Sequence, residues 1–111
     1  MNVPPFISQW SFDVSDVSVW NEKLAEVISV LQQTAGFQKL VVLHSPDEIE
    51  RYIVQCEWNE VGSYRRGISS TPAKMTIWPF LSSMLDQPSA FETLLIATES
   101  EQNVFDSSVE N

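Results

Sequence analysis

The order of two hydrophobic repeats constrains the fold of this chain more than any other feature. Residues 6–14 alternate between apolar and polar side chains, as a strand with one buried face does. Residues 17–31 repeat apolar side chains at steps of three and four, the period of a helix with one buried face. The apolar positions are Phe6, Trp10, Phe12 and Val14 in the strand, and Val17, Trp20, Leu24, Val27, Ile28 and Leu31 in the helix. A strand followed by an amphipathic helix is therefore expected.

Residue types at both ends of this helix fit its expected limits. Ser15, Asp16 and Ser18 are N-cap candidates, because a short oxygen-bearing side chain accepts a hydrogen bond from a free N–H of the first turn. Gly36 is expected to end the helix, since glycine tolerates the left-handed conformation of a C-terminal cap.

A β-hairpin is expected next. Residues 37–44 carry apolar side chains on both faces, and Ser45-Pro46-Asp47 supplies turn residues. Residues 51–58 form the returning strand. Its inward face carries Tyr52, Val54, Cys56 and Trp58.

The second half of the chain predicts a broken helix and a fourth strand. Asn59 is a cap candidate for a helix from about Glu60, which Gly62 and Gly67 weaken. Thr71-Pro72 is a second helix start, and helical residues 73–85 are expected to kink at Pro79. The fourth strand is expected at residues 91–98.

The order β-α-β-β-α-β predicts an α+β, ferredoxin-like fold, in which two helical regions cover one face of a four-stranded antiparallel sheet. The expected domain is residues 1–98, and residues 99–111 form an acidic C-terminal tail. Strands two and four are apolar on both faces, yet the helices cover only one. A second copy of the sheet would cover the other face, so a homodimer with two-fold symmetry is predicted.

Composition excludes several classes of partner. The formal net charge is −9, which argues against nucleic acid and against an anionic membrane surface. The single cysteine, Cys56, lies in an apolar run and allows no intramolecular disulfide. The first residues lack the pattern of a signal peptide, and no apolar run is long enough to cross a membrane. A cytoplasmic protein is the expectation.

In this element order, the residues resemble the antibiotic biosynthesis monooxygenase family of the dimeric α/β-barrel superfamily. The resemblance rests on Gly36-Phe37 opening strand two, Trp58 closing strand three, the Asn59-Glu60 helix start and Tyr64 six residues after Trp58. It covers residues 6–98 and implies a barrel formed by the two sheets of a dimer. It also implies a pocket in each monomer between its sheet and its helices.

The resemblance further implies oxidation of polycyclic phenols by O2 without a cofactor, with Trp58 and Tyr64 at the site. That branch of the family has an Asn four residues before the Trp, where this chain has Val54. A haem-degrading branch needs an Asn in strand one, and a Trp and a His in the second helix. This chain offers Gln9 or Ser11 in strand one, and around Gly67 and Thr76 it has neither the Trp nor the His. No cofactor and no metal are expected.

Each candidate site residue has a structural alternative. The candidate catalytic residues are Trp58, Tyr64 and His44, and the candidate substrate contacts are Trp10, Val54, Met75 and Trp78. Packing in the core alone explains Trp10, Met75 and Trp78 as well as substrate contact does, and it is the favoured interpretation of Trp58. Tyr64 suits a pocket or plain surface, and His44, the only histidine, suits a solvated turn.

Three functions remain open from the sequence. The first is a cofactor-independent monooxygenase acting on a small aromatic or apolar substrate. The second is a non-catalytic dimeric module that binds a small molecule or has a regulatory role. The third is an isomerase or decarboxylase with His44 as its base.

Overall fold

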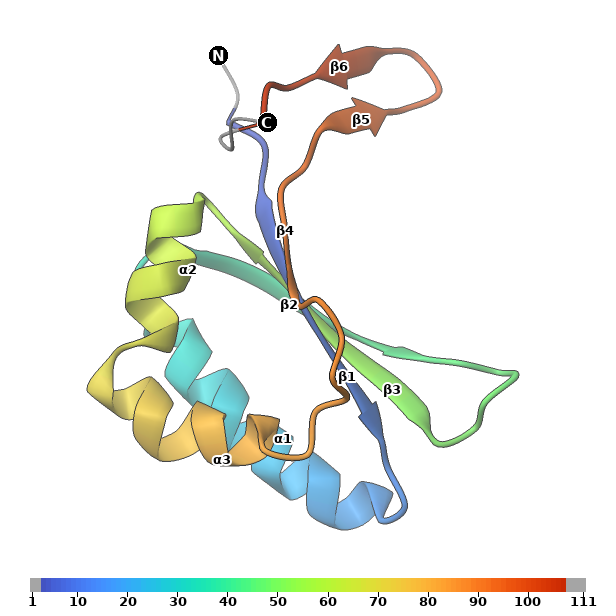
Figure 1. Cartoon of the computed structure of the whole chain (residues 1–111), viewed down its shortest axis with the longest axis vertical. Coiled ribbons are helices and arrows are strands. Elements are labelled where there is room, and N and C mark those ends of the chain that lie inside the picture. Colours follow the sequence, from blue (N-terminus) through green and yellow to red (C-terminus); the bar gives the residue numbers. More distant parts are fainter. Residues whose placement is uncertain (1–2, 108–111) are drawn as a thin grey trace.

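The computed structural model describes residues 3–107 and confirms the α+β, ferredoxin-like architecture. A four-stranded antiparallel sheet has the strand order β2-β3-β1-β4, and all helices lie against one of its faces (Figure 1). The elements in chain order are β1 (Phe6–Asp13), α1 (Val17–Gln32), β2 (Phe37–His44), β3 (Arg51–Trp58), α2 (Val61–Ile68), η1 (Ala73–Ile77), α3 (Trp78–Leu81), β4 (Ala90–Phe91), β5 (Leu95–Ala97) and β6 (Gln102–Val104).

Helix α1 follows its hydrophobic repeat closely. Asp16 caps it by accepting a hydrogen bond from the backbone N–H of Val19 at 3.1 Å. The buried side chains of the helix are Trp20, Leu24, Val27 and Leu31. Val17, expected on the same face, lies in the first turn and is 38% exposed.

At Gly36, the turn after α1 lies close to α2 and to the end of β3. The φ of Gly36 is +86°, a conformation that side chains disfavour, and an added Cβ would collide with Ser63 of α2. The carbonyl of Gly36 accepts a 2.9 Å hydrogen bond from the backbone N–H of Asn59. The turn after α1 is thereby fixed to the end of β3 and to α2.

The start of α2 differs from the expectation. Glu60, not Asn59, occupies the N-cap position, and its side chain makes no capping hydrogen bond. The backbone N–H of Asn59 is bonded to Gly36, so Asn59 connects β3 to the preceding turn. The helix therefore begins at Val61.

The next helical stretch is also shorter than the sequence suggested. The hydroxyl of Ser70 accepts a hydrogen bond from the N–H of Ala73, and the N–H of Trp78 bonds the carbonyl of Ala73 in a π-helical turn. Pro79 has no N–H to continue an α-helical ladder, which accounts for this irregular turn. Helix α3 ends at Leu81, whereas residues up to 85 were expected to be helical.

The fourth strand is the main correction. Only Ala90 and Phe91 join the sheet, beside β1, although residues 91–98 were expected to do so. Continued pairing would set residue 93 opposite Pro5, and proline has no N–H for a ladder. The hydroxyl of Thr93 instead donates a 2.6 Å hydrogen bond to the carbonyl of Pro5.

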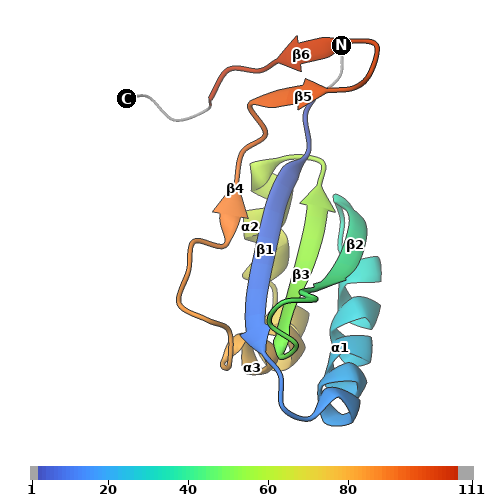
Figure 2. The same ribbon diagram turned by 90° about the vertical axis from the view of Figure 1, so that its right-hand side faces the viewer.

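The chain after residue 93 forms a separate hairpin of β5 and β6, which extends beyond the end of the sheet (Figure 2). The boundary expected at residue 98 therefore falls inside a hairpin. Residues 102–104 of the expected tail are a strand, and residues 108–111 lie outside the described part.

The two faces of the sheet differ in their surroundings. Strands β1 and β3 send Phe6, Trp10, Phe12, Val54, Cys56 and Trp58 into a core shared with the helices. The opposite face, here called the open face, has no helix over it (Figure 1). Alternation along the paired strands gives it five apolar side chains: Ile7, Val41, Leu43, Ile53 and Phe91.

Candidate functional site

Trp58, at the end of β3, is fully buried beneath helix α2. Its indole Nε1 donates a 3.0 Å hydrogen bond to the hydroxyl oxygen of Ser8, which is equally buried. Ser8 is also the β1 partner of Cys56, and its hydroxyl faces the thiol. A buried indole, hydroxyl and thiol therefore meet inside an otherwise apolar core.

Tyr64 lies above this group on α2. Its ring contacts those of Trp58 and Phe6, with centroid separations of 5.6 Å and 5.2 Å. Partial burial raises the pKa of the Tyr64 hydroxyl, and the hydroxyl of Ser89 opposes that rise. Tyr64 is therefore a neutral phenol at physiological pH, suited to donating a hydrogen bond.

Tyr64 forms part of the wall of an open groove of about 410 Å³ between α2 and the β4 segment. This Tyr64 groove is lined by Phe6, Val61, Tyr64, Arg65, Ala90, Phe91, Glu92 and Leu94. Most of its surface is apolar, with the phenol and the two charged residues as polar groups. Its size suits a small aromatic molecule.

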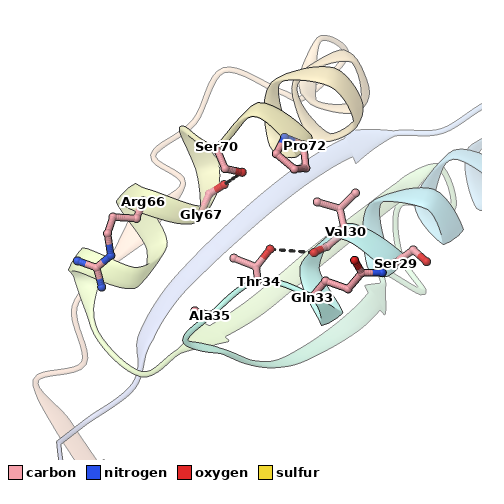
Figure 3. Close-up of a pocket in the computed structure, with 9 residues that line it drawn as sticks. All are labelled: Ser29, Val30, Gln33, Thr34, Ala35, Arg66, Gly67, Ser70 and Pro72. Carbon is pink, nitrogen blue, oxygen red and sulfur yellow. Dashed lines mark hydrogen bonds between the residues drawn. The ribbon is translucent and has the colours of Figure 1, made fainter.

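A second depression, of about 490 Å³, lies on the other side of α2, next to the C-terminal end of α1 (Figure 3). This α1–α2 cleft is lined by Ser29, Val30, Gln33, Thr34, Ala35, Arg66, Gly67, Ser70 and Pro72. The hydroxyls of Thr34 and Ser70 donate to backbone carbonyls within the wall, at 2.8 and 2.7 Å. Among the residues that line the cleft, Arg66 alone carries a charged side chain.

Gly67 separates the α1–α2 cleft from Trp58. A Cβ at this position would lie 2.7 Å from Thr34 Cγ2 and 3.1 Å from the Trp58 ring. The absence of a side chain thus lets α2 pack directly on Thr34 and Trp58. Trp58 lies under α2 and lines neither depression.

Two neighbouring arginines line different depressions. Arg65 lines the Tyr64 groove, and Arg66 lines the α1–α2 cleft. Arg66 also makes a 3.3 Å ion pair with Glu60, in which both side chains are mostly exposed. Such an exposed pair is weak, so a ligand could compete for this guanidinium.

The other predicted site residues do not gather around Tyr64. Trp10 and Val54 are buried in the core. Met75 is 75% exposed on η1, and Trp78 is 47% exposed with its Nε1 bonded to the carbonyl of Ile68 at 2.8 Å. The side chains that this segment buries are Ala73, Ile77 and Phe80.

His44 lies at the opposite end of the sheet from Trp58. It pairs with Tyr52, on which its ring stacks at a centroid distance of 4.5 Å, whereas Phe37 pairs with Trp58. Its Nε2 lies 2.8 Å from the carbonyl oxygen of Ile49 and is exposed. The structure therefore separates His44 from the other two candidate catalytic residues.

Sequence reasoning missed Ser8 and Ser89 as polar neighbours of the Trp58–Tyr64 pair. Ser8 was recognisable, because it occupies an inward position of β1 between Phe6 and Trp10. A small polar residue at such a position needs a buried partner. Ser89 carried no comparable signal, since it precedes a strand of only two residues.

Within residues 3–107, no group of three or more His, Cys, Asp or Glu side chains is placed to share a metal ion. None of the helices in that range is both long and apolar enough to span a bilayer.

Several solved bacterial structures share this architecture. SnoaB of Streptomyces nogalater, a cofactor-independent oxygenase, matches with a TM-score of 0.73 at 14% identity, over 88% of this chain and 99% of that one. A candidate antibiotic biosynthesis monooxygenase of Nitrosomonas europaea matches with a TM-score of 0.64 at 10% identity, over 85% and 94%. A third, from Deinococcus radiodurans, gives 0.63 at 14%, over 79% and 91%. The fold is that of the antibiotic biosynthesis monooxygenases.

At these identities the likeness establishes the monooxygenase fold and no more. No family model and no curated protein matches the sequence. The centre of the space between sheet and helices is filled by side chains such as Trp10, Phe12 and Phe80. The two depressions lie along the sides of α2, and the Tyr64 groove lies where α2 meets the β4 edge of the sheet.

Proposed function

We propose that this protein is a cofactor-independent monooxygenase that binds a small apolar aromatic substrate in the Tyr64 groove. One observation carries the proposal: a neutral, half-buried phenol with a raised pKa lies in the wall of an apolar groove. The oxygenase fold supports it, because SnoaB is a cofactor-independent oxygenase with the same architecture. Perturbed ionisable groups in concave apolar sites are typical of functional sites.

The chemistry requires a substrate that supplies its own electrons. An activated CH₂ between aromatic rings loses a proton to solvent water, and the resulting carbanion gives electrons to O2 to form a carbon–oxygen bond. The peroxide anion takes up a proton from water, and the hydroperoxide then loses water. One oxygen atom remains as a carbonyl, and the other leaves as water with two hydrogens, as many as the CH₂ has lost.

Groups of the groove fit this sequence of steps. The Tyr64 hydroxyl can donate a hydrogen bond to the substrate oxygen on which negative charge develops. Arg65 adds a positive charge beside the groove, although the chain as a whole has a net charge of −9. The rings of Phe6 and Trp58 pack on the Tyr64 ring and limit its motion.

Oxygen uptake by the purified protein with anthrones and hydroquinones, without added cofactor, tests this function. Uptake above the protein-free rate is expected, with a decrease of about tenfold or more in Tyr64→Phe. Tyr52→Phe is the matched control, because the only other tyrosine lies at the His44 end of the sheet. Uptake absent in the wild type, or equal in both variants, would refute the proposal.

A second candidate function is a non-catalytic small-molecule-binding module. The α1–α2 cleft favours it, because its lining offers hydrogen-bonding groups and Arg66 but no residue that can act as an acid or base near neutral pH. Arg66, Gln33 and Ser29 suit a small carboxylate with an apolar body. Binding of benzoate without any oxygen uptake would favour this module over the monooxygenase.

We further infer that the protein forms a homodimer through its open face. Leu43 is 44% exposed and Phe91 40% exposed on this face. Pairing two such faces removes the apolar side chains of both copies from water.

A further inference from the structure

The two walls of the Tyr64 groove differ in the polar groups that they contribute. Helix α2 supplies the hydroxyl of Tyr64, a hydrogen-bond donor, and the positive charge of Arg65, whereas the chain at β4 supplies Glu92. Among the residues that line the groove, Glu92 alone carries a carboxylate. A carboxylate can accept a proton and return it, which a neutral phenol and a guanidinium do not do near neutral pH. The groove therefore has its proton acceptor on the wall across from its donor.

Glu92 is held in place from several directions. The residues before it, in β4, pair with β1. The residue after it, Thr93, donates a 2.6 Å hydrogen bond from its hydroxyl to the carbonyl of Pro5. The side chain of Glu92 is oriented as well, because the hydroxyl of Ser107 donates a 2.7 Å hydrogen bond to its Oε1. Such a bond occupies one of about four lone-pair sites of a carboxylate, so it orients the group and leaves it able to take up a proton.

The position of Glu92 also allows exchange of protons with water. Its side chain is only partly buried, and the groove beside it is open to solvent. A proton that reaches this carboxylate can therefore pass on to water without crossing the core.

The arrangement of the two walls matches the chemistry of an anthrone. In such a molecule the CH₂ and the carbonyl group lie at opposite ends of the central ring, and loss of a proton from the CH₂ places negative charge on the carbonyl oxygen. A substrate lying across the groove presents its CH₂ to Glu92 while its oxygen accepts a hydrogen bond from Tyr64. Arg65 stabilises the same developing charge.

We propose that Glu92 is the general base of this reaction, an inference that rests on the proposed function. Its carboxylate takes one proton from the CH₂, and the electron pair of the broken C–H bond stays on the substrate carbanion. The carbanion gives this pair to O2 as the carbon–oxygen bond forms. Glu92, now a carboxylic acid, gives a proton to the peroxide anion and becomes a carboxylate again. The hydroperoxide then loses water to leave the carbonyl.

Anaerobic hydrogen exchange tests the proton step apart from the oxygen step. Anthrone is incubated with the protein in deuterium oxide under nitrogen, and the loss of its CH₂ hydrogens is followed by proton NMR. Oxygen uptake in air, with its kcat and KM, is measured on the same preparations. The wild type should exchange these hydrogens faster than the protein-free solution does.

Glu92→Gln keeps the shape of the side chain and removes the carboxylate. It should lower the exchange rate and the kcat of oxygen uptake by about a hundredfold or more, with little change in KM. Glu92→Asp should recover part of both rates, because it restores a carboxylate. The matched control is Glu101→Gln, which removes the same charge from an exposed residue outside the groove and should behave as the wild type.

The outcomes separate this inference from the proposed function. Equal exchange rates and equal oxygen uptake in the wild type and Glu92→Gln would overturn the inference and leave the function standing. An equal loss in Glu101→Gln would overturn it too, because the effect would then be one of net charge. Exchange that depends on Glu92 without oxygen uptake would refute the function and support Glu92 as the base. A wild type with neither exchange nor uptake would refute both.

Discussion

The indole Nε1 of Trp58 donates its hydrogen bond to the hydroxyl of Ser8, and the two side chains are completely buried. This contact joins the end of β3 to β1 beneath α2. It satisfies the only polar atom of an indole that would otherwise lie in an apolar core. The position of Trp58 is thus fixed by β1 as well as by its own strand.

Ser8→Ala should lower the free energy of unfolding by about 1–3 kcal/mol, because it leaves a buried N–H without a partner. Urea denaturation measures this change. The control is the double-mutant cycle with Trp58→Phe, in which the serine substitution should cost much less once the N–H is gone. Equal costs in both backgrounds would show that the hydrogen bond contributes nothing.

The two glycines of α2 should respond oppositely to alanine. Gly67→Ala should destabilise the protein by about 1–3 kcal/mol, because its Cβ would press on Thr34 and the Trp58 ring. Gly62→Ala should be neutral or stabilise by up to about 1 kcal/mol, since its Cβ meets only flexible ends of Arg66 and Glu60. Thermal unfolding of both variants measures the difference.

The double variant Gly67→Ala with Thr34→Ser tests the cause. It removes the Thr34 Cγ2 atom, which would lie closest to the new methyl group, and should recover part of the stability. A Gly67→Ala protein as stable as Gly62→Ala would mean that α2 does not pack closely on Trp58.

The sequence predicts an element correctly where its apolar side chains define a single buried face. Helix α1 has one apolar face, and β3 alternates with Ile53 as its one exception, so both could be placed from the sequence. The stretch after Pro72 has two apolar rows, Ala73–Ile77–Phe80 and Met75–Trp78, and periodicity alone cannot choose between them. The structure buries the first row and exposes the second.

The fourth strand shows a different limit. Residues 91–98 have a composition suited to a strand, but their pairing depends on what lies opposite. Pro5 ends the available ladder of β1, and this long-range effect leaves no mark within residues 91–98 themselves. At the site, Tyr64 could be singled out in the sequence, whereas its contacts with Ser89 and the β4 segment depend on that same pairing.

The two adjacent arginines should affect different ligands. Arg65→Ala should weaken anthrone binding in the Tyr64 groove about fivefold and leave benzoate binding unchanged. Arg66→Ala should weaken benzoate binding in the α1–α2 cleft by a similar factor and leave anthrone binding unchanged. Isothermal titration calorimetry gives both constants. If both variants changed the same ligand equally, the two depressions could not be separate sites.

Cys56 should make the protein less stable at alkaline pH. Burial raises the pKa of its thiol from 9.0 to about 12, while the Ser8 hydroxyl opposes the rise. The unfolded thiol ionises above pH 9.0 and the folded thiol does not, so the unfolded state binds fewer protons in this window. The contribution of the neutral thiol is therefore complete below that pH and is lost as the pH rises.

The free energy of unfolding should fall between pH 9.0 and about 12, and Cys56 should account for at most about 1.4 kcal/mol per pH unit. Urea denaturation across this range measures the slope. Cys56→Ala should have a shallower slope, whatever its stability at neutral pH, because it has no thiol to ionise on unfolding. The slope that remains should include Tyr64, whose pKa burial also raises. Identical slopes for the wild type and Cys56→Ala would show that the thiol ionises as readily in the folded protein as in the unfolded chain.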